Sequence, residues 1–222
     1  MNERITIFVG HYGSGKTEVA VNYAIKLKEE GNDVIIVDLD IVNAYYRTKD
    51  NEKMLNDMGI EVISPTYANT NVDIPSLPPH LIKVFADKSK KIVFDVGGDD
   101  AGATALGRFF GYFSQENYQM YSVINTKRPL TDNKENIIIM TEEINYNSRL
   151  RITGLINNTN LSYETECADI LEGEKIVKTV CDELKLPFIF TSLLEENVSE
   201  YKKMSSAKLF PIKKYLNMPW QL

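Results

Sequence analysis

An eight-residue run near the amino terminus has the residue types and spacing for phosphate chemistry: Gly10-His11-Tyr12-Gly13-Ser14-Gly15-Lys16-Thr17. It fits the P-loop pattern G-x-x-x-x-G-K-[ST]. Glycines let the backbone fold so that successive N–H groups point at one anion, and the start of a helix adds positive potential there. In this pattern the lysine reaches the β- and γ-phosphates and the threonine hydroxyl binds Mg²⁺. The expected phosphate-binding residues are Gly10, Gly13, Ser14, Gly15, Lys16, Thr17 and Glu18.

An apolar run that ends in a carboxylate, Ile92–Asp95, has the form of a Walker B strand. The residues that follow continue it as D-x-x-G, which ends at Gly98. The N–H group of Gly98 would sense a γ-phosphate, and loss of that phosphate would release the loop. The alternative is that Asp95 simply ends a strand.

A second apolar run, Val34–Asp38, is followed by Leu39 and Asp40. Alternation would point Asp38 and Asp40 the same way if the strand continued. One carboxylate near Mg²⁺ and another that orients a water would suit hydrolysis or phosphoryl transfer. Two exposed acids at a strand end are the alternative.

Elements must hold these residues together, and the chain alternates short apolar runs with longer segments of helical periodicity. This pattern predicts βαβ units and a parallel sheet. The expected strands are Ile5–Val9, Val34–Asp38, Ile60–Ile63, Ile92–Val96, Gln119–Asn125, Ile152–Asn157 and Phe188–Thr191. One helix runs from Lys16 to Gly31, another begins near Asn133 after the candidate caps Thr131-Asp132, and a third covers Glu164–Lys185. With no repeat or linker, we expect one domain over residues 1–222.

The composition narrows the class of protein. Hydrophobic residues make up 43% of the chain and charged residues 25%, as in ordinary globular proteins. The net charge of −6 argues against broad nucleic-acid binding, which needs a basic face. No apolar run approaches the roughly 20 residues of a membrane span, and no signal peptide is expected. Cys167 and Cys181 form no CxxC pair, so we expect reduced thiols and a cytoplasmic location.

Several stretches leave alternatives open. Residues 64–79 are rich in Pro and Asn and form either a partner or substrate surface or a plain surface excursion. Asp99 and Asp100 would serve as a base, hold a second metal or contact a cationic substrate, or else are solvated. His11 is a polar contact beside the phosphates or an exposed loop residue. For Ala207–Trp220 we favour packing on the sheet over a membrane-surface helix.

The order of the motifs is a P-loop, then V-D-x-D, then an apolar strand that ends D-x-G-G. This order resembles the MinD/ParA/dethiobiotin synthetase class of P-loop NTPases, the SIMIBI class, over roughly residues 4–191. The resemblance implies an α/β fold, with a mostly parallel sheet and helices on both faces in three αβα layers. It also implies binding of ATP and Mg²⁺.

The resemblance implies roles for the acids as well. Asp40 matches the residue that positions the attacking water, and Asp38 and Asp95 match acids around the metal. Residues 38–47 would be a first switch region and residues 95–101 a second.

One departure concerns a second P-loop lysine, which in MinD/ParA proteins reaches across a dimer to the partner's nucleotide. This chain has His11-Tyr12 there. A histidine cannot span the same distance, which argues against a MinD-type ATP sandwich. Dethiobiotin synthetase-like enzymes, which phosphorylate or carboxylate small molecules, also lack a strict signature lysine.

The resemblance places the base after the strand Ile152–Asn157. By it, Asn157 or Asn158 contacts adenine and the neighbourhood of Pro187 lines the pocket, although an Asn pair is also a common turn signal. The guanine-reading N-K-x-D is absent, which favours ATP over GTP. The candidate anion clamps are Arg47, Arg108 and Arg128.

Two functions follow from these expectations. The first is a switch ATPase that binds ATP and ADP and acts on a protein partner or on a second copy of the chain. The second is an enzyme that uses ATP on a small carboxylate or amine. A nucleotide sensor with negligible turnover is a third reading.

Overall fold

The computed structural model describes residues 3–40, 48–64, 79–98 and 100–215. In this part of the chain eight strands form one sheet in the order β3-β2-β4-β1-β5-β6-β7-β8, and the neighbouring strands all pair in parallel. The strands are β1 (Ile5–Val9), β2 (Val34–Leu39), β3 (Ile60–Ile63), β4 (Lys91–Val96), β5 (Tyr118–Ile124), β6 (Gly154–Asn157), β7 (Phe188–Leu194) and β8 (Leu209–Ile212). The strand order reverses around β1, and ligands of open α/β sheets bind at the carboxyl ends of the strands beside such a reversal.

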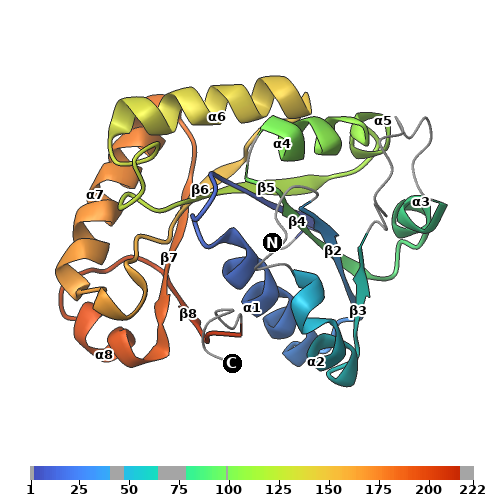
Figure 1. The fold of residues 1–222 in the computed structure, drawn as a ribbon, viewed down its shortest axis with the longest axis horizontal. Coiled ribbons are helices and arrows are strands. Elements are labelled where there is room, and N and C mark those ends of the chain that lie inside the picture. The colour runs from blue at the N-terminus through green and yellow to red at the C-terminus, as the bar shows by residue number, and fades with distance from the viewer. Residues whose placement is uncertain (1–2, 41–47, 65–78, 99, 216–222) are drawn as a thin grey trace.

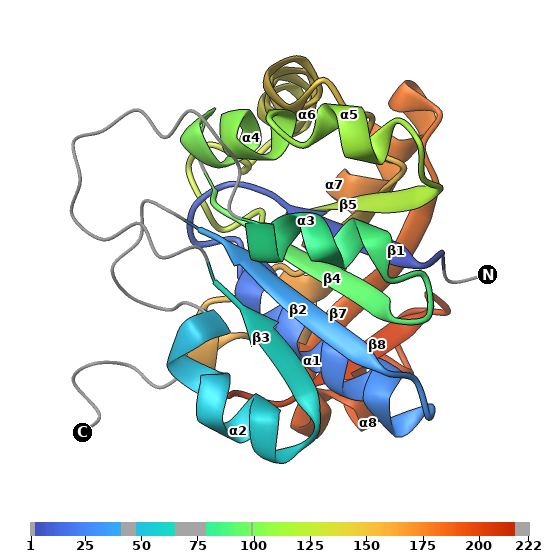
Figure 2. The same ribbon diagram turned by 90° about the vertical axis from the view of Figure 1, so that its right-hand side faces the viewer.

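Helices cover both faces of the sheet. They are α1 (Lys16–Glu29), α2 (Glu52–Asp57), α3 (Pro79–Ala86), α4 (Asp100–Gly107), α5 (Phe110–Phe113), α6 (Lys134–Ser148), α7 (Cys167–Leu184) and α8 (Val198–Tyr201). Short 3-10 turns are η1 (Thr48–Asn51), η2 (Ser162–Glu164) and η3 (Glu195–Asn197). Figure 2 shows the layers: α4, α5 and α6 lie on one side of the sheet and α1 and α2 on the other. The expected three-layer α/β architecture is confirmed, with a fully parallel sheet.

Two apolar cores explain why the strands read as continuous hydrophobic runs. In β1, Ile5, Ile7 and Val9 pack in the core under α3, α4, α6 and α7, whereas Phe8 packs in the core under α1 and α2. Because both faces of a parallel sheet are covered, successive residues are buried in opposite directions. The same alternation in β2 and β4 turns Asp38 and Asp95 toward the α1 face, where the P-loop lies.

The predicted strands are confirmed to within three residues at each end. Strand β8 was not predicted from the sequence. It lies within the stretch Ala207–Trp220 and forms one edge of the sheet. Pro211 lacks an N–H group, and an edge strand tolerates that loss. The cap of α6 was also misplaced: Asn133 accepts a hydrogen bond from the N–H of Asn136 at 2.9 Å, while the Thr131 hydroxyl binds elsewhere.

No helix in the described part of the chain is long and apolar enough to cross a membrane. Cys167 and Cys181 are both buried free thiols, and both lie on α7 as expected.

Candidate phosphate-binding site

The P-loop joins β1 to α1 as a compact turn, the blue loop that leads into α1 in Figure 1. Gly10, Gly13 and Gly15 have φ angles of 146°, 74° and 80°, which only glycine adopts without strain. The N–H of Ser14 donates to the carbonyl of His11 at 3.1 Å and closes the turn. Gly15 then caps α1, so the first helical N–H groups, those of Lys16 and Thr17, face the loop.

Neighbouring atoms leave no room for a side chain at either end of the P-loop, at Gly10 and Gly15. A methyl group at Gly10 would collide with the carbonyl oxygen of Val123, and one at Gly15 would collide with the side-chain amide of Asn158. That amide donates to the carbonyl of Ser14 at 2.7 Å. The loop is therefore held against the carboxyl ends of β5 and β6.

Asp38 and Asp95 occupy paired positions in neighbouring strands β2 and β4, so their side chains lie side by side. The backbone N–H of Asp40 donates to the Asp38 carboxylate at 2.9 Å, and the Thr48 hydroxyl donates to the Asp95 carboxylate at 2.9 Å. The bond to Asp38 turns the chain at Asp40, so the strand does not continue and simple alternation does not apply there. All three carboxylates are at most 6% exposed.

The electrostatics of this cluster are unusual. Burial raises the pKa of Asp95 to about 7, Lys16 acts against this shift and the charge of Asp38 adds to it. The hydroxyls of Thr48 and Thr17 lower the pKa again by hydrogen bonding. Carboxylates withdrawn from water beside the Lys16 ammonium would be stabilised by a further cation.

The loop after β4 closes over the P-loop. A methyl group at Gly98 would lie 2.6 Å from the backbone nitrogen of Tyr12 and 2.9 Å from the Lys16 ammonium. At Gly97 it would lie 3.2 Å from the Asp40 carboxylate. The D-x-x-G segment, Lys16 and Asp40 therefore meet at one place, as the motif order predicts.

Two buried polar atoms in this region lack partners among the described residues. They are the hydroxyl of Ser14 in the P-loop and one carboxylate oxygen of Asp95. Such orphaned groups are rare in folded proteins and call for a ligand, ion or water. A phosphate beside Ser14 and Mg²⁺ beside Asp95 would satisfy both, so these residues fit Mg²⁺ and a nucleotide.

The Asn157 side chain points away from the P-loop, toward helix α7. Its amide donates to the carbonyl of Ile170 at 3.1 Å and to Thr191, and its oxygen accepts from Thr159. The side chain is fully buried against α7, on the face opposite the P-loop. The Asn157 amide therefore anchors the neighbouring helix α7. The adenine contact at Asn157 or Asn158 stays a prediction.

Asn158 points the other way, toward the P-loop, and its amide oxygen accepts from the Ser192 hydroxyl at 2.8 Å. Since an amide carries two N–H groups and two lone pairs, Asn158 keeps one donor and one acceptor beyond these bonds.

Pro187 lies at the edge of the sheet opposite the P-loop. It precedes β7, and its carbonyl accepts from the N–H of Leu155 near the start of β6. The P-loop follows the carboxyl end of β1, so a strand length separates the two. This position does not favour a role of Pro187 in lining the nucleotide pocket, which stays a prediction.

Glu18 holds the carboxyl-terminal part of the chain. Its carboxylate accepts from the N–H of Tyr215 at 2.6 Å, and the neighbouring Asn22 bonds the backbone of Lys213 in both directions. The side chain of Glu18 thus fastens the segment after β8 to the first turns of α1.

The arginines predicted to bind anions do not gather at one place in the described structure. The Arg128 Nε donates to the carbonyl of Gly13 at 3.1 Å, so this side chain lies on the P-loop. Arg108 is exposed just after the end of α4. Arg47 and Asp99 lie outside the described residues, as does nearly all of the 64–79 stretch.

Two residues that shape the site, Thr48 and Gly102, were not predicted from the sequence. Thr48 reaches Asp95 across 47 residues, and no local pattern marks it. Gly102 lets α4 approach the loop after β4: a methyl group there would lie 2.6 Å from the carbonyl carbon of Gly97. An isolated helical glycine was the one available signal.

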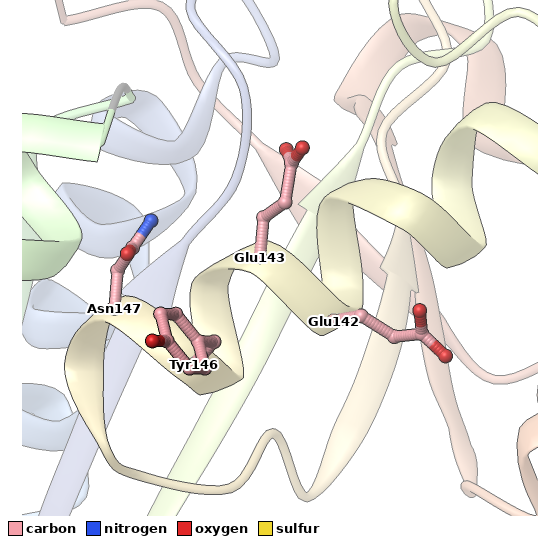
Figure 3. A pocket seen from close by; sticks show the side chains of 4 residues that line it. All are labelled: Glu142, Glu143, Tyr146 and Asn147. Atoms are coloured by element: carbon pink, nitrogen blue, oxygen red, sulfur yellow. The ribbon is translucent and has the colours of Figure 1, made fainter.

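A surface hollow on α6 is separate from this site. Figure 3 shows Glu142, Glu143, Tyr146 and Asn147 projecting from the carboxyl half of that helix. This half adjoins the amino end of β5, where the Tyr118 hydroxyl accepts from the chain just after α6. The P-loop lies at the opposite edge of the sheet.

No protein-family model matches the chain, and no curated protein matches it. Solved structures do. Cell division protein FtsY of Thermotoga maritima aligns with a TM-score of 0.61 and 17% identity over 86% of this chain and 62% of that chain. FtsY of Mycoplasma mycoides aligns with a TM-score of 0.58 and 16% identity over 88% of this chain and 60% of that chain.

A nucleotide-binding protein of Archaeoglobus fulgidus, in complex with ADP, aligns with a TM-score of 0.51 and 16% identity over 90% of this chain and 87% of that chain. The chain shares the overall fold of these solved structures. It spans about three fifths of the length of the FtsY chains it matches. At these identities the likeness concerns the fold, and function has to be argued from the site.

Proposed function

We propose that this chain is a Mg²⁺-dependent ATP-binding protein, an ATPase that acts as a nucleotide-dependent switch on a protein partner. The observation that carries the proposal is the contact of Gly98 with the P-loop. A γ-phosphate held by the loop would meet the backbone of Gly98 beside Lys16. ATP would then hold the loop after β4 in place, and ADP would leave it without that contact.

The residues of the site would have three different roles. The backbone N–H groups of Gly13, Gly15, Lys16 and Thr17 and the Lys16 ammonium would hold the phosphates. Thr17, Asp38 and Asp95 would hold Mg²⁺, which neutralises phosphate charge when bound. Asp40, beside Gly97, would orient the water that attacks the γ-phosphate.

Adenine is the base that the polar groups favour. Asn158 lies beside the P-loop with one donor and one acceptor left over, and the guanine-reading N-K-x-D is absent. The similar protein of Archaeoglobus fulgidus is in complex with ADP, which supports the same choice.

A second candidate is an ATP-dependent ligase or kinase for a small molecule. His11-Tyr12 favours it, because these residues stand where MinD/ParA proteins carry the second P-loop lysine, and Tyr12 is 57% exposed beside Gly98. An acceptor bound there would replace the water or partner of a switch.

Calorimetric titration with Mg²⁺·ATP tests nucleotide binding. Lys16→Ala should weaken ATP by about 100-fold or more, since a buried cation–phosphate pair is lost. Lys175→Ala, which removes an exposed lysine on α7, should bind as the native protein does. Unchanged affinity in Lys16→Ala would refute the proposed site.

Size and turnover separate the two candidates. The switch predicts that a non-hydrolysable ATP analogue changes the molecular size or the capture of a partner, relative to ADP. The ligase or kinase predicts a constant size and phosphate transfer only when a small carboxylate or amine is added.

A further inference from the structure

We propose that Arg128 is a second cation of the nucleotide site and binds the phosphates of ATP and ADP from within the same chain. The inference rests on the proposed function and names a residue that the P-loop pattern does not contain. Lys16 is buried beneath the loop with 4% exposure, whereas Arg128 lies on its exposed side. A polyphosphate on the loop would lie within reach of both.

The contact with the P-loop is close and depends on glycine. The Arg128 Nε donates to the carbonyl of Gly13 at 3.1 Å. A methyl group at Gly13 would lie 3.2 Å from Nε and 3.5 Å from the central guanidinium carbon. The guanidinium therefore rests against the peptide of Gly13, within the loop whose N–H groups would bind phosphate.

The turn that carries Arg128 is rigidly built. Its N–H donates to the carbonyl of Asn125 at 3.2 Å, and its carbonyl accepts from the N–H of Thr131 at 2.9 Å. The Thr131 hydroxyl bonds the same Asn125 carbonyl at 2.6 Å, and both residues are fully buried. The Asn125 amide in turn donates to Asn160 at 3.0 Å, which joins the turn to the loop after β6. Buried polar networks of this kind fix one conformation.

The charge of Arg128 is available for an anion. The adjacent Lys127 is paired with Asp169 at 2.8 Å and Glu172 at 3.2 Å. In the described part of the chain, no carboxylate forms an ion pair with Arg128, whose protein acceptor is the neutral Gly13 carbonyl. A guanidinium gains more from a charged phosphate than from a carbonyl, and it binds phosphate through two parallel N–H groups. We expect the side chain to keep its place on the loop and turn its terminal nitrogens to the ligand.

The test is calorimetric titration of the full chain with Mg²⁺·ATP and Mg²⁺·ADP at two salt concentrations. Arg128→Ala should weaken both ligands by about 10-fold or more, and Arg128→Lys should lose less. The affinity of Arg128→Ala should also depend less steeply on salt, because one cation–phosphate contact is gone. Arg151→Ala is the matched control, since it removes an exposed arginine at the opposite edge of the sheet.

Each other result overturns the inference. Equal affinities for Arg128→Ala and Arg151→Ala would show that Arg128 does not bind the ligand. Weaker binding with an unchanged salt dependence would assign Arg128 to the base or ribose. A native chain that binds neither ATP nor ADP would refute the proposed function itself, and the inference with it. Thermal unfolding of each variant checks that the fold is kept, and Arg128→Lys provides the comparison if Arg128→Ala does not fold.

Discussion

Gly98→Ala tests whether the loop after β4 reads the γ-phosphate. The added methyl group would lie 2.6 Å from the Tyr12 backbone nitrogen and 2.9 Å from the Lys16 ammonium, where ordinary contact begins at 3.4 Å. The φ angle of Gly98 lies outside the left-handed region, so alanine meets no backbone strain there. The loop must therefore move away from the P-loop by roughly 1 Å.

That displacement would break a hydrogen bond from the Gly98 N–H to a charged γ-phosphate. Such a bond contributes about 1.5–3 kcal/mol, which corresponds to about a 10- to 100-fold loss of affinity for a non-hydrolysable ATP analogue. ADP has no γ-phosphate, so its affinity should change by about 2-fold at most. Hydrolysis should fall by about 100-fold, since a 1 Å error in position is enough for that loss.

Calorimetric titration with both nucleotides and a phosphate-release assay measure these effects. Gly111→Ala is the control, because a methyl group on that glycine of α5 meets no atom within 4 Å. Equal weakening of ADP and the ATP analogue in Gly98→Ala would mean that the methyl group disturbs the P-loop itself. Native behaviour toward both nucleotides would refute the sensing contact outright.

Three further predictions concern buried titratable groups. Burial, against the opposing charge of Lys16, raises the pKa of Asp95 to about 7. The folded ligand-free chain then binds a proton more tightly than the unfolded chain, so its free energy of unfolding should fall as the pH rises from about 4 to 7. Thermal unfolding should show this slope flattened in Asp95→Asn, and an unchanged slope would contradict the assignment. Burial alone would raise the pKa of Glu174, but its hydrogen bonds, led by that from Lys178 at 2.7 Å, outweigh burial and lower it. Glu174→Gln should therefore cost about 2–4 kcal/mol of unfolding free energy at pH 7 and less at about pH 3, because the stability from a lowered pKa is lost as the pH falls toward that pKa and the carboxylate takes up a proton. Denaturant titration at both pH values checks this, and an equal cost at both would contradict it. Burial raises the pKa of the Cys181 thiol to about 12, so iodoacetamide at pH 8 should alkylate it only after unfolding. Peptide mass spectrometry measures the modification, and rapid alkylation of the folded chain would contradict the prediction.

The sequence alone determined the features whose residues are contiguous. The P-loop from Gly10 to Thr17 is one turn, so its pattern fixes both its shape and the helix that follows. Asp38 and Asp95 end apolar runs, and parallel strands bring their carboxyl ends to one edge whatever the details of packing. The alternation of strands and helices, and hence the α/β class, follows from the same local periodicity.

Tertiary structure alone decided which way the polar side chains face and what else reaches the site. Asn157 and Asn158 are neighbours in sequence, yet one anchors α7 and the other supports the P-loop, because successive side chains leave a strand on opposite faces. Pro187 lies at the far edge because it precedes its strand rather than following it. Thr48 and Arg128 reach Asp95 and Gly13 from 47 and 115 residues away. Contacts over such separations depend on how the loops pack, and local patterns carry no record of them.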